Sequence, residues 1–174
     1  MVSASHYNDI YLLFKKYSSK IKYIDYKNIL KLIYGIIVKR KIIINGLNNG
    51  EIIEKLINEV ALKMQVRKIS DIKIPLVIPS VDINSGKIYY FISEIKRKQF
   101  SDKIVYDSKI NIGKAVRASC SYPLVFSPCN YNNIQLVDGG IRENVPWKIL
   151  KQMGADKVIS VVFEEKNDGK CCTR

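Results

Sequence analysis

The stretch that decides the fold runs from Ile134 to Phe163 and reads IQLVDGGIRENVPWKILKQMGADKVISVVF. Its first residues form a short apolar run that ends at Asp138, which predicts a buried strand. Val145–Met153 has the pattern of a helix, with a proline in its first turn and a glycine after its last. Val158–Phe163 is a continuous apolar run, typical of strands inside parallel sheets. Strand, helix and strand together predict a βαβ unit with a right-handed crossover, and hence an α/β fold.

Upstream of this stretch, the sequence favours helices first and strands later. Apolar residues at helical spacing predict helices over residues 10–17, 26–38 and 49–64, and a short helix is expected over Ile112–Ser121. Ile74–Val81 and Lys87–Ser93 predict two strands joined as a hairpin. Pro75 and Pro79 indicate that the first of these strands is interrupted or lies at an edge.

The length and composition are those of one globular domain. The chain has 174 residues, of which 47% are hydrophobic and 26% charged, which excludes a disordered chain. We expect a single partial domain over residues 1–174, mainly helical over 1–70, with the sheet over 71–163 and a tail over 164–174. No apolar run reaches the ~20 residues of a spanning helix. With no secretory signal in sight, we expect a cytoplasmic protein, with peripheral attachment to a membrane as a further option.

The charge balance is strongly basic. Lys and Arg number 29 against 16 Asp and Glu, which leaves a formal charge of +13. Such a surface attracts polyanions, whether nucleic acid or an anionic headgroup layer, although heavy use of Lys, Asn, Ile and Tyr throughout the chain indicates a general compositional bias. The four cysteines lack metal spacing and there is one histidine, so the sequence predicts no metal site and no cofactor.

The candidate chemistry lies at Asp138, where a strand gives way to Gly139 and Gly140. In open α/β sheets, sites gather at the carboxyl ends of strands. Two glycines let the backbone turn sharply, with positive φ available, and approach a ligand closely. A carboxylate held there, partly away from water, becomes a stronger base. An isolated Asp-Gly-Gly, however, is most often a plain turn.

Neighbouring motifs change that interpretation. Residues 115–128, AVRASCSYPLVFSP, resemble the pattern Ala-x-x-Ala-Ser-x-x-x-Pro-x-x-Phe-x-Pro of patatin-like lipid acyl hydrolases. The same family order continues with Leu136-Val137-Asp138-Gly139-Gly140, then Asn144-Val145-Pro146, then Gly154-Ala155 and a closing strand. The resemblance implies a patatin-like three-layer α/β fold around a mostly parallel sheet, here truncated at both ends.

The resemblance also implies an activity, the hydrolysis of phospholipid or other acyl esters by a Ser-Asp dyad. Asp138 would be the general base, and Gly139 and Gly140 would shape the active-site turn. No Gly-x-Ser-x-Gly elbow and no glycine-rich oxyanion loop occurs in the 174 residues, and Ser3 and Ser5 are interpreted as helix-surface serines. We therefore expect a fragment that is inactive by itself, because a hydroxyl nucleophile and its base must lie together.

The rival hypothesis is a non-catalytic basic protein that binds an anionic membrane surface or nucleic acid. No stacking motif or zinc spacing supports a specific nucleic-acid partner. The sequence leaves the oligomeric state open.

Several other residues are given ordinary structural roles. Asp82 is expected to cap the hairpin turn, and Arg117 to pair with an acidic neighbour. Ser119 and Ser121 are expected to permit close packing, and Trp147 to pack under the βαβ unit. His6 is interpreted as an ordinary surface or helix residue.

Overall fold

The computed structural model describes residues 11, 12, 15, 48–94 and 101–162 of the chain. Its helices are α3 (Glu51–Lys63), α4 (Ile112–Ser119) and α5 (Trp147–Gln152), with 3-10 turns η1 (Ile69–Asp71) and η2 (Gly139–Ile141). Its strands are β1 (Val77–Asp82), β2 (Ile88–Ile92), β3 (Ile104–Asp107), β4 (Cys129–Tyr131) and β5 (Ile134–Asp138). The expected helices over 10–17 and 26–38 lie outside the described residues, apart from the helical positions 11, 12 and 15.

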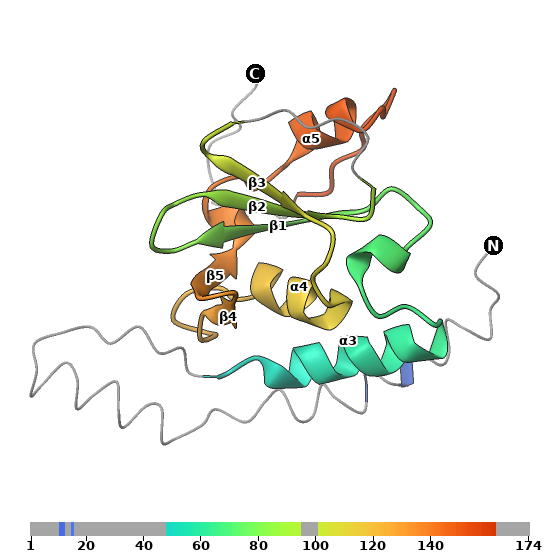
Figure 1. Ribbon diagram of the computed structural model, residues 1–174, viewed down its shortest axis with the longest axis vertical. Coiled ribbons are helices and arrows are strands. Elements are labelled where there is room, and N and C mark those ends of the chain that lie inside the picture. The colour runs from blue at the N-terminus through green and yellow to red at the C-terminus, as the bar shows by residue number, and fades with distance from the viewer. Residues whose placement is uncertain (1–10, 13–14, 16–47, 95–100, 163–174) are drawn as a thin grey trace, which may run out of the picture.

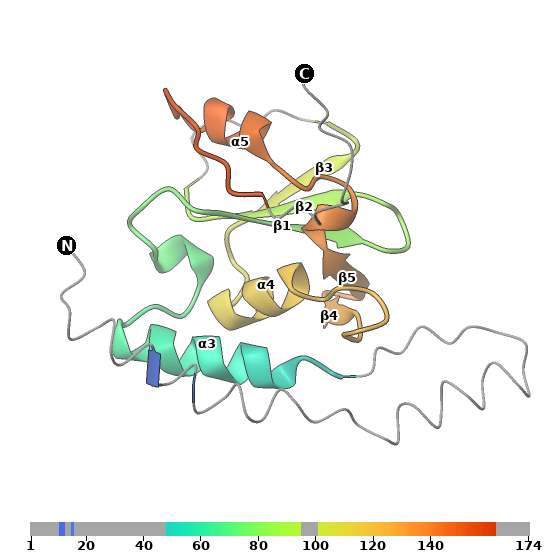
Figure 2. The same cartoon turned by 180° about the vertical axis from the view of Figure 1, so that it is seen from behind.

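Helices cover both faces of one sheet, which confirms the expected α/β fold with three layers. The strand order is β3-β2-β1-β5-β4. Helix α4 packs on one face and α3 lies behind it, whereas α5 lies on the opposite face (Figures 1 and 2). No helix in the described part of the chain has the length and apolar character needed to cross a membrane.

The alternation of side chains along β2 explains how the sheet supports two cores. Phe91 is fully buried in the core that α4 completes, while Tyr90 and Ile92 are buried with Ile149 of α5 on the other face. Successive strand residues point to opposite faces, so an uninterrupted apolar run such as IYYFI suits a strand that is covered on both sides.

The strand directions correct the expectation of a mostly parallel sheet. Within the described residues only β2 and β3 pair in parallel, whereas β1·β2, β1·β5 and β4·β5 are antiparallel. The hairpin of β1 and β2 is confirmed, but β1 lies at the centre of the sheet and not at an edge. Pro79 is tolerated there because it precedes Ser80, the first β1 residue that pairs with β5.

The expected closing strand of the βαβ unit is wrong for the residues that the structure describes. Residues 158–162 form no strand, and the side chains of Ile159 and Val161 are 94% and 81% exposed. An apolar run becomes a strand only where a neighbouring strand offers hydrogen-bonding partners, and this run has none in the described part of the chain. The helix before it is confirmed in part, since α5 begins two residues later than expected, at Trp147.

Candidate active site

Strand β5 carries Asp138 to its carboxyl end and holds it from two sides. Asp138 pairs with Ser80 of β1 in the ladder. Its backbone N–H donates to the carbonyl of Ser121, just beyond the end of α4, at 3.1 Å. The residue is half-buried. The backbone of Asp138 is therefore attached to a central part of the sheet and to the segment after α4, which fixes where its side chain begins.

The turn after Asp138 orients the carboxylate. The N–H of Gly140 donates to Asp138 Oδ1 at 2.7 Å, so that Asp138 caps η2. Within the described residues, no hydrogen bond is made to the second oxygen, Oδ2. One oxygen is thus held by the backbone while the other remains available to accept a proton.

Neither glycine of this turn has positive φ, and Gly139 acts through close approach instead, which corrects the expectation for this turn. The glycines with positive φ in the described residues are Gly50, Gly86 and Gly154. A Cβ on Gly139 would lie 2.7 Å from Pro79 Cβ and 2.8 Å from the Pro79 carbonyl carbon and oxygen. A side chain at this position would collide with the backbone of β1, so Gly139 lets the turn fold directly onto the central strand.

The residues that follow the turn attach it to β2. The backbone N–H groups of Arg142 and Glu143 both donate to the Gly139 carbonyl, at 3.1 and 3.0 Å. The hydroxyl of buried Tyr90 donates to the carboxylate of Glu143. Burial, together with this carboxylate, raises the pKa of Tyr90 well above its ordinary value, so the hydroxyl remains a donor at neutral pH.

The serines next to Asp138 in the fold have their hydroxyls engaged elsewhere. Ser80 Oγ donates to the Val137 carbonyl at 2.7 Å, and Ser121 Oγ donates to the Arg117 carbonyl at 2.8 Å. Ser121 is 1% exposed, in agreement with its expected packing role. Neither serine is oriented as a nucleophile for Asp138.

Cys120 is a neighbour of Asp138 that the sequence analysis did not single out. Its thiol is free, and burial together with the charge of Asp138 raises its pKa. A raised pKa keeps the sulfur protonated at neutral pH, whereas the nucleophile would be the thiolate. The pairing of a thiol with a carboxylate therefore disfavours cysteine chemistry at this site.

The other residues singled out from the sequence have mixed outcomes. Asp82 caps the hairpin turn as expected, accepting from the Asn84 and Ser85 N–H groups and from the Ser85 hydroxyl. Burial alone would raise the pKa of Asp82, but these hydrogen bonds outweigh it and lower that pKa. The expectation for Trp147 is wrong, because its side chain is 50% exposed at the start of α5.

The expected acidic partner of Arg117 is confirmed as Glu54, with Nη1 and Oε2 3.0 Å apart between α4 and α3. Ser3, Ser5 and His6 lie outside the described residues. Among the residues that are described, no group of three or more His, Cys, Asp or Glu side chains is arranged to hold a metal ion.

A comparison with known families places these residues in a wider context. The sequence model of the family described as "Patatin-like phospholipase" matches residues 10–151, well over half of the chain. The matched range includes α3, α4, strands β1 to β5 and the turn at Asp138.

Proposed function

Because the chain belongs to the patatin-like phospholipase family, a family of lipid acyl hydrolases, we propose that Asp138 is the general base of a Ser-Asp dyad that hydrolyses lipid esters. In such a dyad the carboxylate takes the proton of a serine hydroxyl as that oxygen attacks the acyl carbon. Gly139 and Gly140 shape the turn that holds the base.

The geometry of the Asp138 carboxylate is the observation that supports this proposal most. Oδ1 accepts the 2.7 Å hydrogen bond from Gly140 N–H, which sets the plane of the carboxylate. Oδ2 has no hydrogen bond from the described residues and is left for a proton. A base oriented before the reaction gains catalytic power, because no reorganisation is needed in the transition state.

The nucleophile is the part of the dyad that these 174 residues do not contain. No Gly-x-Ser-x-Gly occurs in the sequence. Ser80 and Ser121 donate to backbone carbonyls and are poor substitutes. We propose that a polypeptide of these 174 residues hydrolyses esters negligibly, and that Asp138 becomes catalytic when an elbow serine is present.

We propose that the lipid substrate is presented at a membrane to which the protein attaches peripherally, from the cytoplasm; the surface chemistry supports the contact with the membrane. The formal charge of +13 favours anionic headgroups. Exposed apolar side chains lie next to the residues that hold Asp138. Tyr122 follows Ser121, whose carbonyl accepts from the Asp138 N–H, and Ile141 ends the turn η2; they are exposed by 59% and 53%. Such residues suit contact with acyl chains.

The test uses a short acyl ester and two forms of the protein. The 174-residue chain is assayed alone, and again after fusion to an upstream segment that carries a Gly-x-Ser-x-Gly elbow. We expect background hydrolysis from the first form and turnover from the second, reduced about 10²–10⁴-fold by Asp138→Asn. Asp102→Asn, at an exposed position, is the matched control and should keep full turnover.

Two results would contradict the proposal. Turnover by the unfused chain that is lost in Asp138→Asn would show that the chain already contains a nucleophile. Turnover by the fused form that survives Asp138→Asn would remove Asp138 from the role of base.

A further inference from the structure

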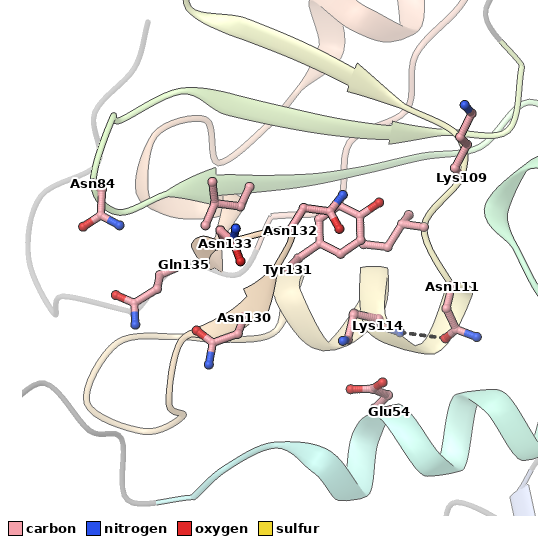
Figure 3. Close-up of a pocket in the computed structure, with 12 residues that line it drawn as sticks. Glu54, Asn84, Lys109, Asn111, Lys114, Asn130, Tyr131, Asn132, Asn133 and Gln135 are labelled. Carbon is pink, nitrogen blue, oxygen red and sulfur yellow. Dashed lines mark hydrogen bonds between the residues drawn. The ribbon is translucent and has the colours of Figure 1, made fainter.

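A polar cleft lies at the other end of β5 from Asp138. It has a volume of about 770 Å³ and is formed by the β4–β5 turn, the loop between β1 and β2, and the start of α4 (Figure 3). Asp138 is four residues along the strand from Ile134, which lines the cleft, or about 13 Å. The cleft is therefore separate from the candidate active site.

Side-chain amides dominate the cleft. Figure 3 shows Asn84, Asn130 and Gln135 on one side and Lys109, Asn111 and Lys114 on the other. Within the described part of the chain, no hydrogen bond is made by four of the amide side chains, those of Asn84, Asn130, Asn133 and Gln135. Each amide offers both a donor and an acceptor, as does each hydroxyl of a polyol.

The cleft also carries an excess of positive charge. Lys109 and Lys114 both line it, and neither has an acidic partner within ion-pair distance among the described residues. Glu54 is the one carboxylate in the lining, and its charge is already paired with Arg117 at 3.0 Å. The ammonium group of Lys114 is thus available for an anionic ligand, whereas the Lys109 side chain points away from Lys114 and adds only to the positive charge of the rim (Figure 3). Lysine binds phosphate as a point charge.

The backbone N–H groups at the start of α4 are not available to an anionic ligand. Its first three N–H groups, from Ile112, Gly113 and Lys114, donate to the Arg67 carbonyl, Asn58 Oδ1 and Asn111 Oδ1. Recognition therefore depends on side chains, and substitutions can test it without unwinding the helix.

The β4–β5 turn presents its amides from a rigid backbone. Asn132 and Asn133 both have positive φ, 44° and 63°, and they join the paired residues Tyr131 and Ile134. This is the two-residue turn with a twist that matches antiparallel strands, and asparagine tolerates it better than most residues. The Tyr131 ring beside the turn offers an apolar face, and its hydroxyl is bonded to Asp107 at 2.6 Å.

From these features we propose that the cleft binds a phosphorylated polyol, with Lys114 on the phosphate and the unbonded amides on the hydroxyls. The same chemistry occurs in a free sugar or inositol phosphate and in the headgroup of an inositol lipid. The site does not depend on the proposed role of Asp138.

Calorimetric titration of the whole 174-residue chain tests the ligand class with three probes: inositol monophosphate, inositol and inorganic phosphate. We expect inositol monophosphate to bind at least about tenfold more tightly than either of the others, because only it engages both the amides and Lys114. Two results would overturn the proposal. One is that inorganic phosphate binds as tightly as inositol monophosphate; the other is that the chain binds neither inositol monophosphate nor phosphatidylinositol in vesicles. Co-sedimentation with phosphatidylinositol vesicles, compared with phosphatidylcholine vesicles, distinguishes the lipid source from the free one.

Variants connect the binding to the cleft. Lys114→Gln should weaken the binding of inositol monophosphate about tenfold or more, because a charge-assisted hydrogen bond is lost. Asn133→Gly removes an amide while keeping a residue that accepts positive φ, so affinity should fall while the melting temperature does not. Lys148→Gln on α5 removes the same charge outside the cleft and is the matched control. If Lys114→Gln and Lys148→Gln lose the same affinity for inositol monophosphate, the binding depends on overall charge alone and the proposed site is refuted.

Discussion

Replacing Gly139 by alanine tests the contact that shapes the candidate active-site turn. The new Cβ would lie 2.7–2.8 Å from the side chain and backbone of Pro79. Since real Cβ atoms almost never come within 3.0 Å of another heavy atom, the turn and β1 must separate by several tenths of an ångström. Pro79 lies on the central strand, which cannot yield without disturbing its neighbours.

The expected cost follows from this overpacking. Forcing an additional methyl group into a packed site typically destabilises a protein by about 1–3 kcal/mol. Replacing glycine by alanine also restricts the unfolded chain, and this offsets about 0.4–1 kcal/mol of the lost stability. Gly140→Ala gains the same offset, but its nearest neighbour is a side-chain atom, Asp138 Oδ1, at 3.1 Å. The difference in stability between the two variants therefore isolates the contact with Pro79.

Urea unfolding followed by far-ultraviolet circular dichroism measures both variants. Gly139→Ala should be about 1–3 kcal/mol less stable than Gly140→Ala, which corresponds to a melting temperature several degrees lower for a chain of this size. In the fused hydrolase, Gly140→Ala should retain the fold but lose activity, because its methyl group displaces the Asp138 carboxylate. Equal stability of the two variants, or a more stable Gly139→Ala, would refute the close approach of the turn to β1.

Three further outcomes follow from other contacts. Gly113→Ala should destabilise the chain by about 1–3 kcal/mol in urea unfolding, because the new Cβ would lie 2.5 Å from the backbone oxygen of Glu54. Unchanged stability would show that α3 and α4 are not so close. Burial and the hydrogen bond to Asp107 raise the pKa of Tyr131 to about 12, so stability should fall as the pH rises from about 10 to 12. Tyr131→Phe should flatten that fall in alkaline unfolding curves, and an unchanged curve would contradict the hydrogen bond. The pKa of Asp82 is lowered, so its contribution to folding stability is present above about pH 4 and is lost as the pH falls further. Asp82→Asn should therefore weaken the loss of stability in acid. An identical loss in the variant would argue against the cap.

Local signals account for the parts of the fold that were predicted well. Helix α3 begins after the Asn-Gly loop, the β1–β2 hairpin closes at its Asp-Ile-Asn-Ser-Gly turn, and α5 ends before Gly154, which has the positive φ of a helix stop. Strand β5 ends at Asp138 as expected. Each of these signals depends on residues close together in the chain, so a reader of the sequence can recognise it.

Pairing between distant segments accounts for the errors. The short strands β3 and β4 were not predicted, because a run of three or four residues becomes a strand only through its neighbour in space. The apolar run at 158–162 was predicted as a strand on composition alone, yet it has no neighbour in the described residues. Strand direction likewise depends on the path of the whole chain.

The sequence by itself determined that Asp138 ends a strand, that two glycines follow it, and which family the motifs resemble. Only the tertiary structure decided that Gly139 touches Pro79, that the carboxylate has one oxygen bonded and one available, and that loops from three regions enclose a cleft rich in amides. The physical reason is that hydrophobic periodicity and turn chemistry are encoded over a few residues, whereas close approach, burial and charge pairing arise from segments that meet only after the sheet has formed.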